Sequence, residues 1–376
     1  MQLKALAIAA FAATAYAQES GGLVQALSNV TELSNLTSYL NLFPDFVQQL
    51  SQLSNVTLLA PSNDAFAEFL NSSAGSALAN NDEALIQGIL SYHVLNGTYE
   101  SFNDTEFIPT ALQPTQYTNV TGGQVVQAVG DGETVTFYSG FLSASNVTGE
   151  PVNFTGGVVH IIDAVLIVPQ NISATAIESN LTAAVGALTR AELAQTVNDL
   201  QDVTIFVPDN TAFDDIGNLI GNLTTDNLTD ILTYHVVNGT VAYSTDLENT
   251  TLSTLNGENI TISIIDDEVF VNSAKVTVAD VLVANGVVHV IDSVLNPGNS
   301  TAEPNPDEEE SEPAFEGASS AANDLTSGVP TPTGTTNPTD SAPGATSSSS
   351  EDSAPMMTGA VGAAALFGGA AVLANW

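Results

Sequence analysis

Gly157–Leu166 reads GVVHIIDAVL, and nearly the same ten residues return at Gly286–Leu295 as GVVHVIDSVL. Valine and isoleucine are stiff at χ1 and fit the pleated, buried surface of a sheet, so each copy is predicted to be a core strand. A proline follows each copy within a few residues, at Pro169 and Pro297, where a strand is expected to end. The repetition therefore predicts two units, each closed by such a strand.

Two further blocks recur in the same order before the closing strand. Val56–Phe66 (VTLLAPSNDAF) matches Val203–Phe213 (VTIFVPDNTAF), and each reads as a strand, a proline that ends it and a polar cap for a following helix. Tyr92–Thr98 (YHVLNGT) matches Tyr234–Thr240 (YHVVNGT), with a tight turn expected at Asn-Gly. The unequal spacing between the blocks favours two homologous globular domains over a solenoid of fixed period.

The stretches between the blocks show helical and strand patterns. Helical spacing of apolar residues covers 23–53, 83–90, 174–200 and 225–232. Short strands are expected at 124–129, 133–138, 259–265 and 268–271. Helices followed by several antiparallel strands predict the α+β class, with domains at residues 19–169 and 170–297.

The two ends of the chain differ in composition from the body. Residues 1–17 combine Lys4, an apolar run and Ala15-Tyr16-Ala17, which predicts a cleaved signal peptide rather than a buried N-terminal helix. Residues 298–355 are mostly Ser, Thr, Pro, Gly, Ala and acidic residues, which predicts a disordered, O-glycosylated stalk. The acidic run Asp307–Glu310 lacks the ligand spacing of a calcium loop and is expected to be solvated.

The apolar tail at 356–376 follows small residues and has no basic cluster after it, a pattern typical of a GPI-anchor signal. A transmembrane tail anchor is the alternative. Removal of the signal would take Trp376, the only tryptophan, from the mature protein. The candidate attachment residues are all small: Gly344, Ser347, Ser348, Ser349 and Ser350.

Charge and cysteine usage exclude several classes of protein. The chain has 42 Asp and Glu residues against Lys4, Arg190 and Lys275, for a formal net charge of −39. It has no basic patch to hold a phosphate backbone, so no nucleic-acid partner is expected. It has no cysteine, which excludes disulfides, thiol catalysis and cysteine-ligated zinc.

Asn-x-Ser/Thr sequons are dense through the body of the chain. In a secretory protein this density predicts N-glycosylation at several of them, although Asn and Thr are also simply common here. Asn55 enters an apolar strand and is expected to be shielded. The other candidates are Asn29, Asn35, Asn71, Asn96, Asn103, Asn119, Asn146, Asn153, Asn171, Asn180, Asn222, Asn227, Asn238, Asn249, Asn259 and Asn299.

With the three blocks in place, the chain resembles the fasciclin family in a fungal-type, secreted, GPI-anchored form with two domains. The first family motif resembles Thr57–Phe66 and Thr204–Phe213, and the second resembles Gly157–Leu166 and Gly286–Leu295. The Tyr-His blocks are a third shared feature. The resemblance implies a fold in which each domain has a β-wedge or sandwich of about seven strands and a cluster of helices. It also implies a role in adhesion or in cell-surface and matrix contacts.

The chain departs from the pattern of animal family members, which engage integrins near the Tyr-His block and through an Asp-Ile motif. Here the order is Ile-Asp, at Ile162-Asp163 and Ile291-Asp292, inside the core strand. The chain also has no Arg-Gly-Asp. Integrin binding is therefore not carried over from the resemblance.

All four histidines fall in the repeated blocks: His93, His160, His235 and His289. Histidines and many carboxylates suggest a metal or acid–base site. Their apolar surroundings instead favour neutral, buried histidines whose ring nitrogens are hydrogen-bonded. Asp163 and Asp292 lie three residues after a histidine, on the opposite face of a strand. These aspartates are expected to accept local backbone hydrogen bonds rather than to form a dyad.

The sequence holds no nucleophile elbow, phosphate loop or zinc-binding His pair. We therefore predict no catalytic residue, no cofactor and no metal site, and do not expect an enzyme. A glycosidase-type carboxylate pair is the enzymatic alternative that the composition leaves open. The candidate interaction residues are those of the Tyr-His blocks: Tyr92, His93, Tyr234 and His235.

These features predict a cell-surface glycoprotein that mediates adhesion or contact with the cell wall or extracellular matrix. The expected partners are proteins or glycans of the cell surface or matrix, and the membrane through a GPI anchor. The expected location is the outer face of the plasma membrane or the cell wall. The alternatives are a structural cell-wall glycoprotein without a specific partner, or a membrane-tethered protein of the vacuole or secretory route.

Overall fold

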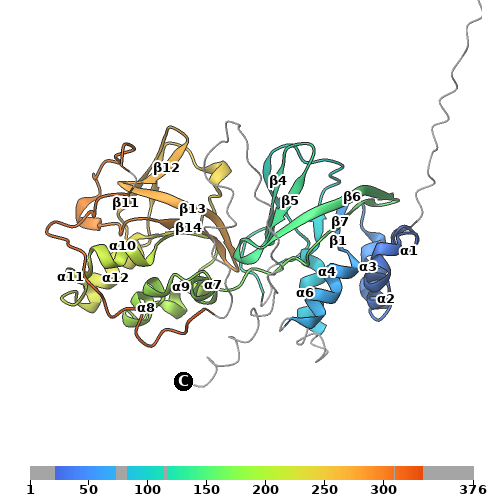
Figure 1. Cartoon of the computed structure of the whole chain (residues 1–376), viewed down its shortest axis with the longest axis horizontal. Helices are drawn as coiled ribbons and strands as arrows, with labels where there is room; N and C mark the ends of the chain where they lie inside the picture. The colour runs from blue at the N-terminus through green and yellow to red at the C-terminus, as the bar shows by residue number, and fades with distance from the viewer. Residues whose placement is uncertain (1–21, 73–82, 114–116, 309, 333–376) are drawn as a thin grey trace, which may run out of the picture.

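The computed structural model of the chain describes residues 22–72, 83–113, 117–308 and 310–332. Figure 1 shows two bodies side by side along the long axis, each with helices on one side and strands on the other. The expected signal peptide, GPI attachment residues and apolar tail lie outside the described residues. None of the helices within the described ranges is long and apolar enough to cross a membrane.

The first domain opens with short helices and closes with the repeated strand. Its helical segments are α1 (Leu23–Ser28), η1 (Thr31–Leu33), α2 (Ser34–Leu40), α3 (Pro44–Gln52), α4 (Asn63–Asn71), α6 (Glu83–Tyr92) and η2 (Gly140–Leu142). Its strands are β1 (Val56–Pro61), β2 (Val94–Asn96), β3 (Thr105–Pro109), β4 (Val125–Gly130), β5 (Val135–Tyr138), β6 (Ala144–Phe154) and β7 (Gly157–Ile162).

The second domain repeats this order. Its helical segments are α7 (Ile172–Glu178), α8 (Thr182–Arg190), α9 (Ala194–Asp199), α10 (Asn210–Asp215), α11 (Gly217–Ile220), α12 (Thr225–Tyr234), η3 (Ser244–Asp246) and η4 (Pro297–Asn299). Its strands are β8 (Val203–Pro208), β9 (Val236–Asn238), β10 (Thr250–Ser253), β11 (Asn259–Ile265), β12 (Glu268–Val271), β13 (Ala274–Val283) and β14 (Gly286–Ile291).

Each domain holds one seven-stranded sheet, with the orders β2-β1-β7-β6-β5-β4-β3 and β10-β11-β12-β13-β14-β8-β9. The two strands that carry the repeated motifs lie parallel to each other, β7 beside β1 and β14 beside β8. The other named strand pairs are antiparallel. The α+β class with about seven strands per domain is thereby confirmed.

The parallel pair explains why each closing strand begins with glycine. A Cβ atom added to Gly157 would lie 1.8 Å from the carbonyl oxygen of Val56 on β1. A Cβ atom on Gly286 would lie 1.9 Å from the carbonyl oxygen of Val203 on β8. The neighbouring backbone occupies the space that any side chain would need, so only glycine fits.

Helices after the first strands begin where the cap residues predict. The Ser62 hydroxyl accepts a hydrogen bond from the Ala65 N–H (3.2 Å), and the Asp209 carboxylate accepts one from the Ala212 N–H (2.7 Å). Both satisfy a backbone donor in the first helical turn. Strands β11 and β12 have the predicted bounds, whereas β3, β6, β10 and β13 were not predicted. Residues of β6 alternate irregularly between exposed and buried, so the strand lacks a clear apolar pattern.

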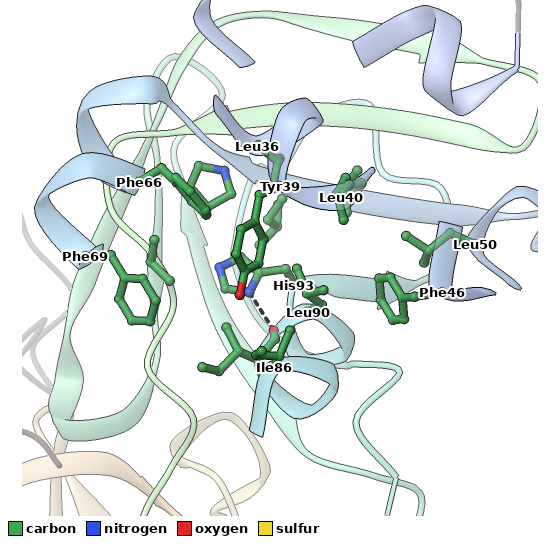
Figure 2. A pocket seen from close by; sticks show the side chains of 15 residues that line it. Leu36, Tyr39, Leu40, Phe46, Leu50, Phe66, Phe69, Ile86, Leu90 and His93 are labelled. Carbon is green, nitrogen blue, oxygen red and sulfur yellow. Dashed lines mark hydrogen bonds between the residues drawn. The ribbon is translucent and has the colours of Figure 1, made fainter. Parts of the chain in front are cut away.

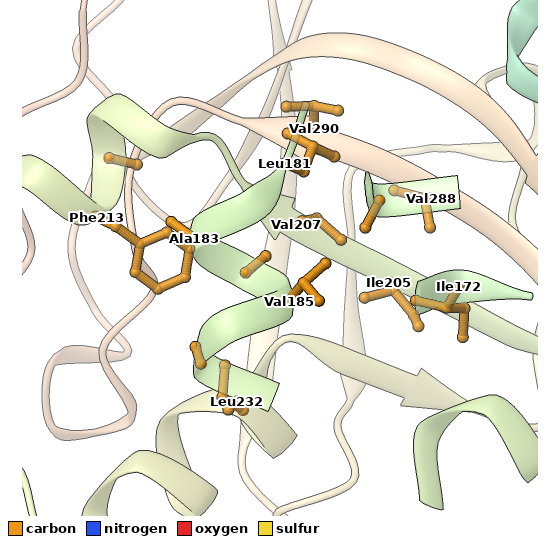
Figure 3. Packing of buried hydrophobic residues seen from close by; sticks show 14 of the residues in the cluster. Ile172, Leu181, Ala183, Val185, Ile205, Val207, Phe213, Leu232, Val288 and Val290 are labelled. Carbon is orange, nitrogen blue, oxygen red and sulfur yellow. The ribbon is translucent and has the colours of Figure 1, made fainter. Parts of the chain in front are cut away.

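The core of the second domain lies between its helices and the central strands. Figure 3 shows Val207 and Ile205 of β8 facing Val185 of α8, with Val288 and Val290 of β14 beside them. These side chains belong to one buried apolar cluster. Their position explains the near-continuous apolar sequence of both strands, because both faces of the parallel pair are covered.

The first part of the expected stalk does not stand free. Among the described residues beyond 297, Leu325 is 4% exposed and joins the core cluster of the second domain, with Phe315 and Val329 packed against it. The backbone of this C-terminal segment (residues 311–329) also bonds to the domain, as when the Ser311 N–H donates to the Asp292 carboxylate (2.9 Å). The low-complexity composition concealed a few apolar residues that suffice to dock the segment.

Candidate functional site

The Tyr-His block ties the end of a helix to the end of the closing strand. His93 follows α6, and its Nδ1 donates to the Ile89 carbonyl (2.8 Å) while its Nε2 accepts from the Leu166 N–H (3.0 Å). In the second domain, His235 makes the same two bonds to Ile231 (2.8 Å) and Leu295 (3.0 Å). Because Nε2 accepts, each ring is the neutral tautomer that carries its proton on Nδ1.

Burial keeps these two rings neutral. Loss of solvation lowers the pKa of His93 to about 4 and the pKa of His235 to about 4, opposed in each case by the bond to the helix carbonyl. A proton on Nε2 would also abolish the bond from the backbone N–H. The hydrogen-bonded, neutral state expected from the sequence is confirmed.

The tyrosine of each block reaches the outer part of the sheet. The Tyr92 hydroxyl donates to the Val125 carbonyl of β4, and the Tyr234 hydroxyl donates to the Asn259 carbonyl of β11, both at 2.8 Å. Tyr92, His93, Tyr234 and His235 are all at most 4% exposed. The structure therefore contradicts the prediction that they contact a partner, because interior side chains do not reach a macromolecule at the surface.

The histidines of the closing strands hold the loop after the Tyr-His block. His160 Nε2 donates to the Tyr99 carbonyl (2.7 Å), and His289 Nε2 donates to the Ala242 carbonyl (2.9 Å). Burial lowers the pKa of His160, opposed by its bond to Tyr99. These rings, like the first pair, perform a structural task.

The aspartates after the closing histidines accept backbone hydrogen bonds, but the donors are not local in sequence as expected: they lie on the preceding strand or in the C-terminal segment. The Asp163 carboxylate accepts from the backbone and side-chain N–H groups of Asn146 (2.7 and 2.9 Å). The Asp292 carboxylate accepts from the backbone N–H of Lys275 (2.8 Å) and of Ser311 (2.9 Å). Both carboxylates thus fasten the turn after the strand rather than face a histidine.

The sequon asparagines are displayed over both domains. All the predicted ones are exposed except Asn119, which is half-buried. Asn55 is also exposed, contrary to the expectation that it is shielded, because it lies just before β1 with a positive φ of 60°. Its side-chain oxygen accepts from the Thr98 N–H (3.2 Å).

Asn119 lies where the two domains meet. Its side-chain amide donates to the Leu200 carbonyl (3.1 Å), and its backbone N–H donates to the Ala284 carbonyl (2.7 Å). The third sequon residue, Thr121, donates its hydroxyl to the Asp202 carboxylate (2.5 Å). Both residues that define the sequon are engaged by the second domain, so the folded pair conflicts with a glycan at Asn119.

An apolar and aromatic contact completes the interface between the domains. The rings of Phe107 on β3 and Tyr243 stack with centroids 4.1 Å apart and planes 11° apart. Leu142 of the first domain is 1% exposed and belongs to the core cluster of the second. Gln124, in the first domain, donates its side-chain amide to the Val283 carbonyl of β13 (2.9 Å). Buried contacts of this kind join the two domains into one unit.

Sequence reasoning missed this interface. The contacting pairs are Phe107 with Tyr243 and Thr121 with Asp202. The members of each pair are far apart in the sequence, and no motif around them indicates that they meet. Within the described ranges, no group of three or more His, Asp or Glu side chains is arranged to hold a metal ion.

Each domain thus has a seven-stranded sheet of mixed strand direction, with the repeated motifs on its parallel pair. The chain is therefore a tandem pair of α+β domains. The Fasciclin domain family matches the chain over residues 31–169 and 179–297. The chain belongs to the fasciclin domain family, as its resemblance to that family predicted.

Several curated proteins are similar to this chain over most of its length. A "Fasciclin-like arabinogalactan protein" from Arthroderma benhamiae is 39% identical over 339 residues, covering 89% of this chain and 80% of the relative. "Fasciclin-like arabinogalactan protein elcF" from Phaeosphaeria nodorum is 31% identical over 274 residues, covering 72% of this chain and 86% of the relative.

Among solved structures, a FAS1 domain pair from the insect cell adhesion molecule Fasciclin I is similar at 21% identity with a TM-score of 0.34. The match covers 69% of this chain and 96% of the insect chain.

Proposed function

We propose that this protein is a cell-surface glycoprotein that mediates adhesion, or contact with the cell wall or extracellular matrix, through its paired fasciclin domains. The observation that carries the proposal is that sequon asparagines are exposed on both domains. Asn119 is the one predicted sequon asparagine that is not fully exposed. Exposed Asn-x-Ser/Thr sites are what the glycosylation machinery requires. The similar fungal proteins are named as arabinogalactan proteins, which are glycan-bearing by name.

The domain interface supports a role for the pair as one unit. Stacked Phe107 and Tyr243, together with the inserted Leu142, hold the domains together. A joined pair presents loops of both domains to one partner at once, and two linked contacts raise avidity when their geometry is fixed. The partner class is a protein or glycan of another cell or of the matrix.

We further propose that the protein is held at the outer face of the plasma membrane or in the cell wall by a GPI anchor. The support is the composition of the chain ends: an apolar stretch with an A-x-A site at the start, and small residues before an apolar tail at the end. A vacuolar or secretory-route address is an outcome that a fluorescent tag inside residues 333–343 would reveal.

A structural wall glycoprotein without a specific partner is the second candidate. The observation that favours it is the acidic surface, since a formal net charge of −39 and attached glycans would hold water within a wall. Binding measurements separate the two. Native and enzymatically deglycosylated protein are titrated onto purified wall material and a glycan array. Saturable binding supports recognition, whereas linear, salt-sensitive adsorption at every surface supports the structural role.

A further inference from the structure

The C-terminal segment crosses the helices of the second domain at two glycines. A Cβ atom added to Gly186 of α8 would lie 1.6 Å from the Leu325 carbonyl oxygen, and one added to Gly217 of α11 would lie 1.8 Å from that of Ala321. In Figure 1 the orange-red end of the described chain runs past α11 and α8. The backbone of the segment thus lies directly against these helices, and a side chain at either glycine would displace it.

The helices at this crossing have counterparts in the first domain. The Asn63 side-chain oxygen at the start of α4 accepts a hydrogen bond from the Asn35 N–H of α2 (2.8 Å). The Asn210 side-chain oxygen at the start of α10 accepts one from the Ala183 N–H of α8 (2.9 Å). These equivalent bonds fix which residues of the two domains correspond.

Counted from these bonds, the two glycines occur in the second domain alone. Ser38 of α2 corresponds to Gly186, and Leu70 of α4 corresponds to Gly217. In the first domain, side chains therefore occupy the two places where the second domain leaves room for a backbone. The glycines suit the second domain specifically to hold the segment.

One apolar side chain holds the far end of the segment. Leu325 is the one buried residue between positions 311 and 329, and it lies in the core cluster of the second domain. Just before it, Asn323 donates to the Asp214 carboxylate (2.8 Å) and Arg190 pairs with Asp324 (3.5 Å). Both contacts are exposed, and exposed contacts of this kind contribute little to stability. Leu325 is therefore the main anchor at this end.

The chain between η4 and the segment is held by short-range bonds. The Ala302 N–H donates to the Asn299 carbonyl, and the Glu308 N–H donates to the Asn305 carbonyl, both at 3.3 Å. Of the described residues from 300 to 310, none is buried. Once the segment leaves the helices, residues 298–329 would span about 100 Å when extended.

We propose that the C-terminal segment is a force-released strap, which detaches from α8 and α11 under a pull from beyond residue 332 before either domain unfolds. The order follows from the path of the chain, because such a pull reaches Leu325 before it reaches any strand of the second domain. The few buried contacts of the segment make it the least stable part of this path. Its release lengthens the tether of the domain pair by up to about 100 Å.

The longer tether would let the paired domains follow a moving partner, since tether length sets which distances a bound pair can span. This use rests on the proposed anchoring at the cell surface, whereas the release itself does not. Detachment of cells and release of the strap are measured separately, so either proposal can fail alone.

The test stretches the single folded chain in optical tweezers. The chain has no cysteine, so Ser20→Cys and Ser341→Cys provide two unique handle sites outside the described residues. We expect a first, reversible step of up to about 100 Å, ahead of steps of about 400–500 Å for the unfolding of each domain.

Gly186→Ala should abolish the first step and leave the domain steps in place. The atoms nearest to the added Cβ all belong to Leu325, and alanine favours the helical state of α8. Leu325→Ala should also abolish the first step. Gly221→Ala is the matched control and should keep it, since a Cβ atom there has nothing within 4 Å.

The domain steps show in each trace that the variant is folded. Absence of a first step of this size in the parent overturns the proposal. So does a first step that is unchanged in both Gly186→Ala and Leu325→Ala.

Discussion

The Leu166 N–H donates to Nε2 of His93 across 3.0 Å, and the second domain repeats the bond between Leu295 and His235. The bond joins the end of the helix before the Tyr-His block to the segment that follows the closing strand. It exists only while the ring is neutral, because a protonated Nε2 has no lone pair to accept with. In each domain, this hydrogen bond links the Tyr-His block to the closing block. A single proton added to the histidine ring would break it.

Protonation of these rings should destabilise both domains in mild acid. The unfolded-state pKa of histidine is 6.5 and the folded-state pKa is about 4, so the unfolded chain binds more protons between these values. Stability is therefore full above pH 6.5 and falls as the pH drops toward 4, by up to about 3 kcal/mol per histidine. Urea unfolding from pH 7 to pH 4 measures the slope.

His93→Gln is the matched variant for this prediction. Its side-chain oxygen can still accept from the Leu166 N–H but does not titrate, so the first domain should lose that part of its pH dependence. The same change at His235 should act on the second domain. A pH profile that is identical in parent and both variants would contradict the assigned tautomers.

Substitution of the first glycine of a closing strand should disrupt its domain. Gly157→Ala and Gly286→Ala each place a Cβ atom within 2 Å of a carbonyl oxygen on the neighbouring strand, at 1.8 and 1.9 Å. We expect a loss of about 2–4 kcal/mol in stability, since the parallel strands must separate. Gly221→Ala is the control, because Gly221 has φ −63° and open space around it. Equal stability of Gly286→Ala and Gly221→Ala would show that the strands do not pair as described.

The sequon at Asn119 should differ from all the others in glycan occupancy. Its amide donates to the Leu200 carbonyl and its Thr121 hydroxyl donates to Asp202 of the second domain. Peptide mass spectrometry of secreted protein should find Asn119 largely unmodified and exposed sites such as Asn153 and Asn227 occupied. Full occupancy of Asn119 in a folded chain would mean that the domains do not meet in this way.

Truncation of a buried C-terminal side chain should release the segment from the second domain. Leu325→Ala removes a 4% exposed side chain from the core, at a cost of about 2–4 kcal/mol. Limited proteolysis should then cleave the variant within residues 311–329 before it cleaves either folded domain. Ser327→Ala, at an exposed position of the same segment, serves as the control. Identical cleavage of both variants would show that Leu325 does not hold the segment.

Local signals predicted the framework of each domain. Runs of β-branched residues, each followed by a proline, predicted the strands β1, β7, β8 and β14. A Ser or Asp cap predicted the helices that follow β1 and β8. The burial of all four histidines followed from their apolar neighbours. These features depend on residues close together in sequence, so one sequence suffices to predict them.

Features made by distant residues could not be predicted. Phe107 and Tyr243 come from different domains, and neither has neighbours that indicate a stacked pair. The apolar gap around Tyr39 (Figure 2) depends on how helices α2, α3, α4 and α6 pack against β1. The docking of Leu325 was hidden by a composition that is typical of disorder. The Tyr-His residues were proposed as contacts through family resemblance, and their burial corrects that.

The proposed adhesive role of the paired domains is tested most directly on whole cells. Cells that lack the chain are complemented with the parent, or with the Gly286→Ala variant, whose second domain is expected to be destabilised. Single-cell force spectroscopy then measures their detachment from like cells and from wall material. We expect the parent to raise the detachment force over the empty vector and the variant not to. Detachment forces that are the same for parent, variant and empty vector, with the parent shown at the surface by antibody, would contradict it.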